Sequence, residues 1–178
     1  MAPAAIGGDS QEGSPGGSSR QLTHVDESGA ARMVDVTAKS VSEREAVASG
    51  RVRVSRAVVA LLRGDGVPKG DALAVARVAG ILGAKRTADL VPLCHPIGLS
   101  GVTVDLDVED DAVAITATVR TADRTGVEME ALTAVAVAAL TVVDMVKAVD
   151  KAAVIDDIKV LSKRGGQSGA WTRAGQPS

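Results

Sequence analysis

The chain has 178 residues, of which 46% are hydrophobic and 24% charged, and its formal net charge is −2. These values indicate one folded domain of ordinary size and exclude a generic basic nucleic-acid binder. Cys94 is the single cysteine, and Trp171 is the single residue among Phe, Tyr and Trp. An intramolecular disulfide, a zinc site with two cysteines of one chain and an aromatic platform for base stacking are therefore excluded.

The two ends of the chain are rich in Gly, Ser, Pro and Gln. We expect a disordered tail over residues 1–20, a single domain over 21–164 and a flexible C-terminal tail over 165–178. The longest apolar stretch, 131–143, is too short to cross a bilayer, and the N-terminus lacks the apolar run of a signal peptide. We therefore expect no membrane partner and a cytoplasmic location.

The first half of the domain alternates between apolar periodicity and breaker residues. Alternation predicts a strand over 46–54, after which Ser55 can cap a short helix over 56–63. Gly and Pro predict a loop over 64–70, and a helix should run from Asp71 to about Leu90. The sequence VPLCHP, with prolines at 92 and 96, ends that helix.

The second half begins with the clearest pattern in the chain. Apolar and polar residues alternate over 102–108 and again over 113–119, on either side of a turn at 110–111, which predicts a β-hairpin with one buried face. A long helix over about 127–149 and a last strand over about 154–162 follow. The order β-α-β-β-α-β predicts a ferredoxin-like α+β fold: an antiparallel sheet with helices packed on one face. The bare face and the thin, ring-free core favour contacts between subunits, but the fold does not identify a function.

The loop Leu93-Cys94-His95-Pro96 is the most suggestive site for chemistry. The imidazole of His95 suits proton transfer near neutral pH, although an ordinary half-buried histidine fits the pattern equally well. Cys94 is more typical of a small buried residue than of a nucleophile.

Carboxylates occur at both ends of the long predicted helix. Thr125 and Glu128 match a capping box, which explains Glu128 without any function, and Glu130 falls in the favourable first turn. Asp144 and Lys147 share one face near the other end, as a surface ion pair or as an acid/base pair in a desolvated pocket. Glu130 and Asp144 are about 21 Å apart along a helix. Either the ligand is long, or the two ends serve different copies of the site.

Two lysines could meet an anionic ligand, and both also fit a solvated loop or tail. Lys69 lies just before a predicted helix N-terminus, where phosphate would be favoured. Lys163 and Arg164 end the last strand before two glycines.

Taken together, these motifs resemble the cyclic pyranopterin monophosphate synthase family of molybdenum cofactor biosynthesis. The resemblance runs from about Leu22 to Gly169 and is carried by four segments: LTHVDESGAARMVDV (22–36), KGDALAVARVAGILGAKRTADLVPLCHP (69–96), TGVEMEALTAVAVAALTVVDMVKAVDK (125–151) and KRGGQSG (163–169).

The resemblance implies a phosphorus-oxygen lyase assembled as a homohexamer, a trimer of dimers, with active sites at subunit interfaces. Its substrate would be 3′,8-cyclo-7,8-dihydroguanosine 5′-triphosphate, which a radical S-adenosylmethionine enzyme makes from GTP. The products would be cyclic pyranopterin monophosphate and diphosphate. No metal or organic cofactor is implied.

The resemblance also implies residue roles. Asp144 matches the catalytic acid/base and Lys147 the essential lysine beside it, and His95 is a third candidate for proton transfer. The substrate-binding residues would be Leu93, Cys94, His95, Met129 and Glu130, with Lys69, Glu128 and Lys163 in the same pocket.

Two other functions stay open at this point. One is a ferredoxin-like oligomer that binds an anionic metabolite without catalysis, for which an acid/base pair would serve no purpose. The other is a phosphate-ester hydrolase that uses a metal at His95 and Glu130, whose activity chelation would abolish.

Overall fold

The structure is a computed structural model that describes residues 28–64, 71–167 and 169–175. Residues 33–178 belong to one compact unit, which carries every element discussed below. The predicted N-terminal tail and Lys69 lie outside the described residues.

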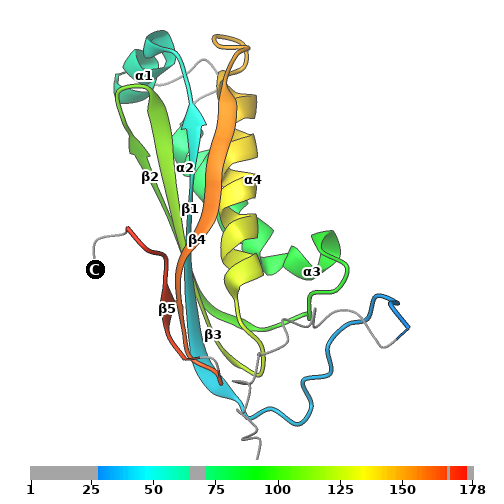
Figure 1. Cartoon of the computed structure of the whole chain (residues 1–178). Coiled ribbons are helices and arrows are strands. Elements are labelled where there is room, and N and C mark those ends of the chain that lie inside the picture. Colours follow the sequence, from blue (N-terminus) through cyan, green and yellow to red (C-terminus); the bar gives the residue numbers. More distant parts are fainter. Residues whose placement is uncertain (1–27, 65–70, 168, 176–178) are drawn as a thin grey trace, which may run out of the picture. The chain divides into compact units, whose positions relative to one another are not determined.

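An antiparallel sheet forms one layer of the unit, and helices form the other (Figure 1). In the described part of the chain the strands lie in the order β2-β3-β1-β4-β5, and every neighbouring pair is antiparallel. The strands are β1 (Ser42–Arg53), β2 (Leu99–Val108), β3 (Ala112–Asp123), β4 (Val154–Arg164) and β5 (Trp171–Thr172), and the helices are α1 (Arg56–Arg63), α2 (Ala72–Lys85), α3 (Thr87–Leu90) and α4 (Glu128–Val146).

The predicted fold class is confirmed. The long helices α2 and α4 pack against each other and against the same face of the sheet. The predicted hairpin is formed by β2 and β3, in which Leu106 lies opposite Ile115 and Val104 opposite Ala117. These side chains point toward the helices and are buried, because successive residues of a strand alternate between faces. The strand β5 was not predicted, and it lies within the residues expected to form the C-terminal tail.

The core is built from small side chains that let the backbones approach closely. A Cβ atom at Gly80 of α2 would lie 2.9 Å from the carbonyl oxygen of Ala134 in α4. A Cβ atom at Gly50 of β1 would lie 2.6 Å from Cγ1 of Val135. Helix α4 therefore packs closely against both α2 and the sheet, with no room for a larger side chain at Gly50 or Gly80.

Helix α4 is the core helix of the unit. Within the described residues it is the one helix whose length and composition would allow it to cross a membrane. Its inward residues Ala131, Ala138 and Val142 are fully buried against α2 and the sheet. That burial accounts for its apolar composition.

Two predicted features of the helices differ from the structure: one helix boundary and one N-cap. The helix expected over 71–90 is broken at Arg86 into α2 and α3, because the Arg86 amide donates to Gly83 and the Thr87 hydroxyl to Ala84. Ser55 occupies the N-cap position of α1, but its side chain makes no capping hydrogen bond. Its backbone N–H instead donates to the Asp150 carboxylate at 2.7 Å.

We predict that Gly80→Ala lowers the free energy of unfolding by about 1–3 kcal/mol, because overpacking outweighs the gain in helix propensity. Urea unfolding at fixed protein concentration measures the change. Gly98→Ala is the matched control, since a Cβ atom there would meet nothing within 4 Å. Equal stability of the two variants would contradict the tight contact between α2 and α4.

Candidate functional site

The first turn of α4 presents two carboxylates to two different hollows. Val127 occupies the N-cap position and is buried, so the helix begins at Glu128. Side chains two residues apart on a helix point about 200° apart, which separates Glu128 from Glu130. Glu128 lines a hollow beside the end of β4, and Glu130 lines one beside α2 and α3.

The predicted capping box is wrong. No side chain caps α4, and Thr125 precedes the N-cap residue by two positions. The Glu128 carboxylate instead pairs with Lys163, with 2.8 Å between Oε1 and Nζ, and both side chains are about one-third exposed. Glu128 folds back over Gly126, where a Cβ atom would collide with the carboxylate. Glu128, which has the spacing of a capping residue, therefore makes a contact between α4 and β4 instead.

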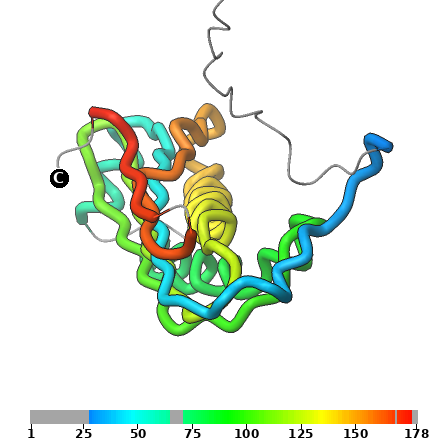
Figure 2. Tube along the Cα trace, turned by 60° about the horizontal axis from the view of Figure 1, so that its bottom comes forward, coloured from blue at the N-terminus to red at the C-terminus, as the bar shows by residue number. Residues whose placement is uncertain are grey.

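The hollow around this ion pair, the Lys163 hollow, has a volume of about 190 Å³. Figure 2 shows the chain that follows β4 beside the first turn of α4. Cations outnumber carboxylates in the lining, so the hollow suits a polyanion. Its charged residues are Lys39, Arg44, Glu45, Arg124, Glu128, Lys163 and Arg164.

Sequence reasoning did not select Lys39, Arg44 and Arg124 for this hollow. The Arg44 guanidinium is anchored from the sheet side, with Nε donating to the carbonyl of Asp123 at 2.9 Å. Its position beside Lys163 depends on the pairing of β1 with both β3 and β4. Hydropathy patterns carry no signal for that pairing.

The second hollow, the His95 hollow, has a volume of about 300 Å³. It brings His95 and Glu130 together with the end of α2, including Lys85 and Arg86. Nε2 of His95 lies 2.8 Å from the carbonyl oxygen of Val34. Because a carbonyl only accepts, Nε2 must carry a proton, and Nδ1 holds the lone pair of the neutral ring.

Glu130 is buried in this hollow, with 4% of its surface exposed. Burial raises its pKa to about 7, its own backbone N–H acts in the opposite direction, and the negative charge of Glu128 adds to the rise. A carboxyl group with this pKa can both donate and accept a proton near neutral pH.

Cys94 is half-buried beside Glu130. Burial and the charge of Glu130 both raise the pKa of its thiol, which keeps the sulfur protonated. The structure therefore agrees with the expectation that Cys94 is no nucleophile. Leu93 is also half-buried, whereas Met129 is 39% exposed between the two carboxylates.

Asp144 and Lys147 form an ion pair with 2.7 Å between Oδ1 and Nζ, and each side chain is more than half exposed. Of the two interpretations left open by the sequence, the single chain shows the surface ion pair. The pair lies near the end of α4, about 21 Å along the helix from Glu130. One chain therefore does not bring these residues to the two hollows.

The described part of the chain contains no group of three or more His, Cys, Asp or Glu residues placed to hold a metal ion. His95, Glu130 and Asp89 all line one hollow, but among the residues that the structure describes they are not grouped closely enough to hold a metal ion.

Comparison with known proteins identifies the family. The model of the MoaC family matches residues 33–166. The chain belongs to the MoaC family. It is 73% identical over 154 residues to the cyclic pyranopterin monophosphate synthase of Streptomyces coelicolor, covering 86% of this chain and 91% of that protein.

Other relatives give the same result. The protein of that name from a Nocardioides species is 72% identical over 159 residues, covering 88% of this chain and 98% of the relative. That of Corynebacterium glutamicum is 60% identical over 152 residues, covering 85% and 97%. Identity of this extent supports the enzyme assignment that the sequence resemblance implied, and with it a part in molybdenum cofactor biosynthesis.

We predict that Glu130 makes stability fall with rising pH between about 4.5 and 7. The folded state keeps the proton to a higher pH than the unfolded state, so the contribution is complete below pH 4.5 and lost as pH passes 7. Glu130→Gln should remove a pH-dependent contribution of the order of 3 kcal/mol. Urea unfolding from pH 5 to 8 at fixed concentration measures it, with Glu109→Gln as a control at a partly exposed, ion-paired carboxylate. An unchanged pH profile in Glu130→Gln would contradict the buried acid.

Proposed function

We propose that this chain converts 3′,8-cyclo-7,8-dihydroguanosine 5′-triphosphate into cyclic pyranopterin monophosphate and diphosphate. Family membership supports the assignment, and one structural observation carries it further. The first turn of α4 separates a cationic hollow from a hollow with two proton-transfer groups. A triphosphate joined to a ring that must be rebuilt needs both environments.

The Lys163 hollow would hold the phosphates. Attack of the ribose-derived 2′ oxygen on the α-phosphate forms the cyclic monophosphate and expels diphosphate as the leaving group. Negative charge grows on the departing phosphates, and cations already in place stabilise it. Lys163 would supply one such charge, and Lys69, which the resemblance places in the pocket, would supply another.

The His95 hollow would hold the ring system. Opening and reclosing a purine-derived ring as a pterin requires several proton transfers. With Nε2 directed at the carbonyl of Val34, the His95 ring leaves Nδ1 for exchange with the substrate. Glu130, with its raised pKa, can donate or accept at the same pH. Leu93, Cys94 and Met129 would line the substrate around these two groups.

Asp144 and Lys147 would complete the site from another copy of the chain. Their separation from Glu130 along α4 supports sites shared between copies of the chain, in which the two ends of α4 serve different sites. The assembly would be the homohexamer, a trimer of dimers, that the resemblance implies. Exposed apolar side chains on the outer side of the helical layer support such packing. They are Val75, Val78 and Leu82 of α2 and Leu140 of α4.

The remaining partners are those that the resemblance implies. The substrate would come from a radical S-adenosylmethionine enzyme acting on GTP, and we place both reactions in the cytoplasm. The chain would need neither a nucleic acid nor a membrane.

The direct test supplies the cyclic dihydroguanosine triphosphate and follows diphosphate release together with the fluorescent oxidised pterin. We expect both signals in equal amounts, with and without chelator. Neither signal from a folded oligomer that binds the nucleotide would favour the non-catalytic binding module. Activity lost on chelation would favour the metal-dependent hydrolase.

We predict that Asp144→Asn and Lys147→Ala each reduce turnover by at least about a hundredfold, as expected for general acid/base groups. Both residues are exposed in the single chain, so the fold should persist. Turnover and sedimentation measure the two effects. The control is Asp157→Asn with Lys159→Ala, an exposed ion pair on β4. Near-normal turnover in either test variant would remove that residue from the mechanism.

We predict that Asp144→Asn and Lys163→Ala subunits, each of which turns over little substrate alone at subsaturating concentration, recover activity when they are co-expressed in one oligomer. If each site takes Asp144 from one copy and Lys163 from another, some sites of a mixed oligomer receive both unmutated residues. Random mixing then restores about a quarter of wild-type turnover. No recovery in a verified mixed oligomer would place Asp144 and Lys163 in the same subunit's site.

A further inference from the structure

The end of β4 presents two neighbouring cations to opposite faces of the sheet. Lys163 pairs with Ala46, whose side chain is buried under the helices, so Lys163 lies on the helix face. Arg164 pairs with Glu45 and lies on the open face. The position of Lys163 in its hollow therefore depends on how firmly this strand end is held.

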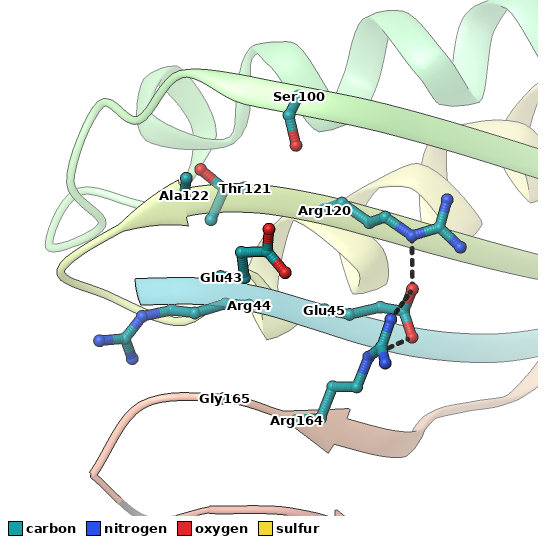
Figure 3. Close-up of a pocket in the computed structure, with 9 residues that line it drawn as sticks. All are labelled: Glu43, Arg44, Glu45, Ser100, Arg120, Thr121, Ala122, Arg164 and Gly165. Atoms are coloured by element: carbon teal, nitrogen blue, oxygen red, sulfur yellow. Dashed lines mark hydrogen bonds and ion pairs between the residues drawn. The ribbon is translucent and has the colours of Figure 1, made fainter. Parts of the chain in front are cut away.

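Glu45 holds Arg164 and a second arginine on the open face (Figure 3). Its carboxylate lies 3.0 Å from Nε of Arg164 and 2.5 Å from Nε of Arg120 on β3. The Glu45 side chain is only 17% exposed, whereas the two arginines are 68% and 55% exposed. The carboxylate is therefore the fixed centre of a contact that joins β3, β1 and β4.

This carboxylate stays ionised in the folded chain. Burial disfavours its charge, but the hydrogen bonds from Arg120 and Arg164 and their positive charges outweigh burial and lower the pKa of Glu45. Hydrogen bonds between oppositely charged groups are among the stronger side-chain contacts in proteins.

Strand β4 ends at Arg164, and the next residue still lies close to β1. Gly165 has φ +91°, and its Cα lies against the backbone of Glu43, where a Cβ atom would collide with the carbonyl oxygen. On its other side the strand end pairs with β5, where Lys163 lies opposite Trp171. The Glu45–Arg164 pair is therefore a side-chain contact between β1 and β4 at the last residue of β4.

We propose that Glu45 is a positioning residue for Lys163: by clamping Arg164 on the open face, it fixes the strand end that aims Lys163 at Glu128 and the phosphate-binding hollow. The inference rests on the proposed function, because it assigns Lys163 to the substrate phosphates. Glu45 and Arg164 also line the Lys163 hollow, but the Glu45 carboxylate is bound to arginines on the open face and is assigned no part in the reaction.

The chain offers a matched control on the same open face. Arg51 of β1 pairs with Glu109 at 2.5 Å, and both side chains are partly exposed. Glu109 lies beyond the end of β2, and Arg51 lies opposite Asp156, near the start of β4. Removing Glu109 therefore costs a similar cross-strand pair without touching the strand end that carries Lys163.

The first experiment measures Lys163 without any ligand. In an NMR spectrum of full-length protein labelled with ¹³C-lysine, each lysine gives a signal from Cε, the carbon bonded to Nζ. The signal of Lys163 is identified by its loss in Lys163→Ala. We expect Glu45→Ala to move this signal toward that of solvent-exposed lysines, Glu45→Gln to move it part-way, and Glu109→Ala to leave it unchanged. An unmoved signal in Glu45→Ala would overturn the proposal, whether or not the chain has the proposed activity.

The second experiment is a double-mutant cycle on turnover of the cyclic dihydroguanosine triphosphate. We expect Glu45→Ala to raise KM about tenfold with kcat within about twofold, as for lost ground-state binding of the phosphates. In the Lys163→Ala background, Glu45→Ala should have no further effect on KM. Additive effects of the two substitutions on KM would overturn the proposal, because a structural role of Glu45 that is independent of Lys163 would raise KM equally in both backgrounds. If wild-type protein shows no turnover, the proposed function fails, while the ligand-free signal still decides the role of Glu45.

Discussion

Close approach of backbones holds this protein together, because its core has no large aromatic rings to fill space. Gly50, Gly80 and the alanines of α4 let that helix lie between α2 and the sheet at distances that a single extra methyl group would violate. The helix has little freedom to slide or rotate in such a setting. Its two ends are therefore placed accurately, and the candidate chemistry lies at those ends.

The placement of α4 divides the candidate site into parts that one chain cannot unite. Its first turn separates Glu128, which meets Lys163, from Glu130, which shares a hollow with His95. The Asp144–Lys147 pair belongs to the other end and is open to solvent. Water screens an exposed ion pair, so its proposed catalytic use requires that another copy cover it.

Much of the fold could be predicted because it rests on simple alternation. The hairpin of β2 and β3 and the buried length of α4 follow from the apolar pattern, and the α+β class follows from the order of elements. The break at Arg86 could not be predicted, because it depends on where the Thr87 hydroxyl finds an acceptor. The capping box predicted at Glu128 is wrong because the spacing from Thr125 fits a cap, whereas the partner of Glu128 lies on a distant strand.

The candidate site was less accessible to physical reasoning from the sequence than the fold was. The pairs Glu130 with His95 and Lys163 with Glu128 are formed by packing of elements far apart in the chain, and the resemblance, not their spacing, pointed to them. Arg44 shows the same limit, since the register of β1 brings it to Lys163, and Lys39 lines the same hollow from the segment before β1.

The most direct measurement is the structure of the assembled protein with the cyclic dihydroguanosine triphosphate bound, trapped in the Asp144→Asn variant. Our expectation is one ligand in contact with His95, Glu130 and Lys163 or their partner equivalents. The same ligand should contact Lys147 from a different copy from the one that supplies Glu130. A ligand held entirely by residues of one chain, with the Asp144–Lys147 end of α4 left in solvent, would contradict it.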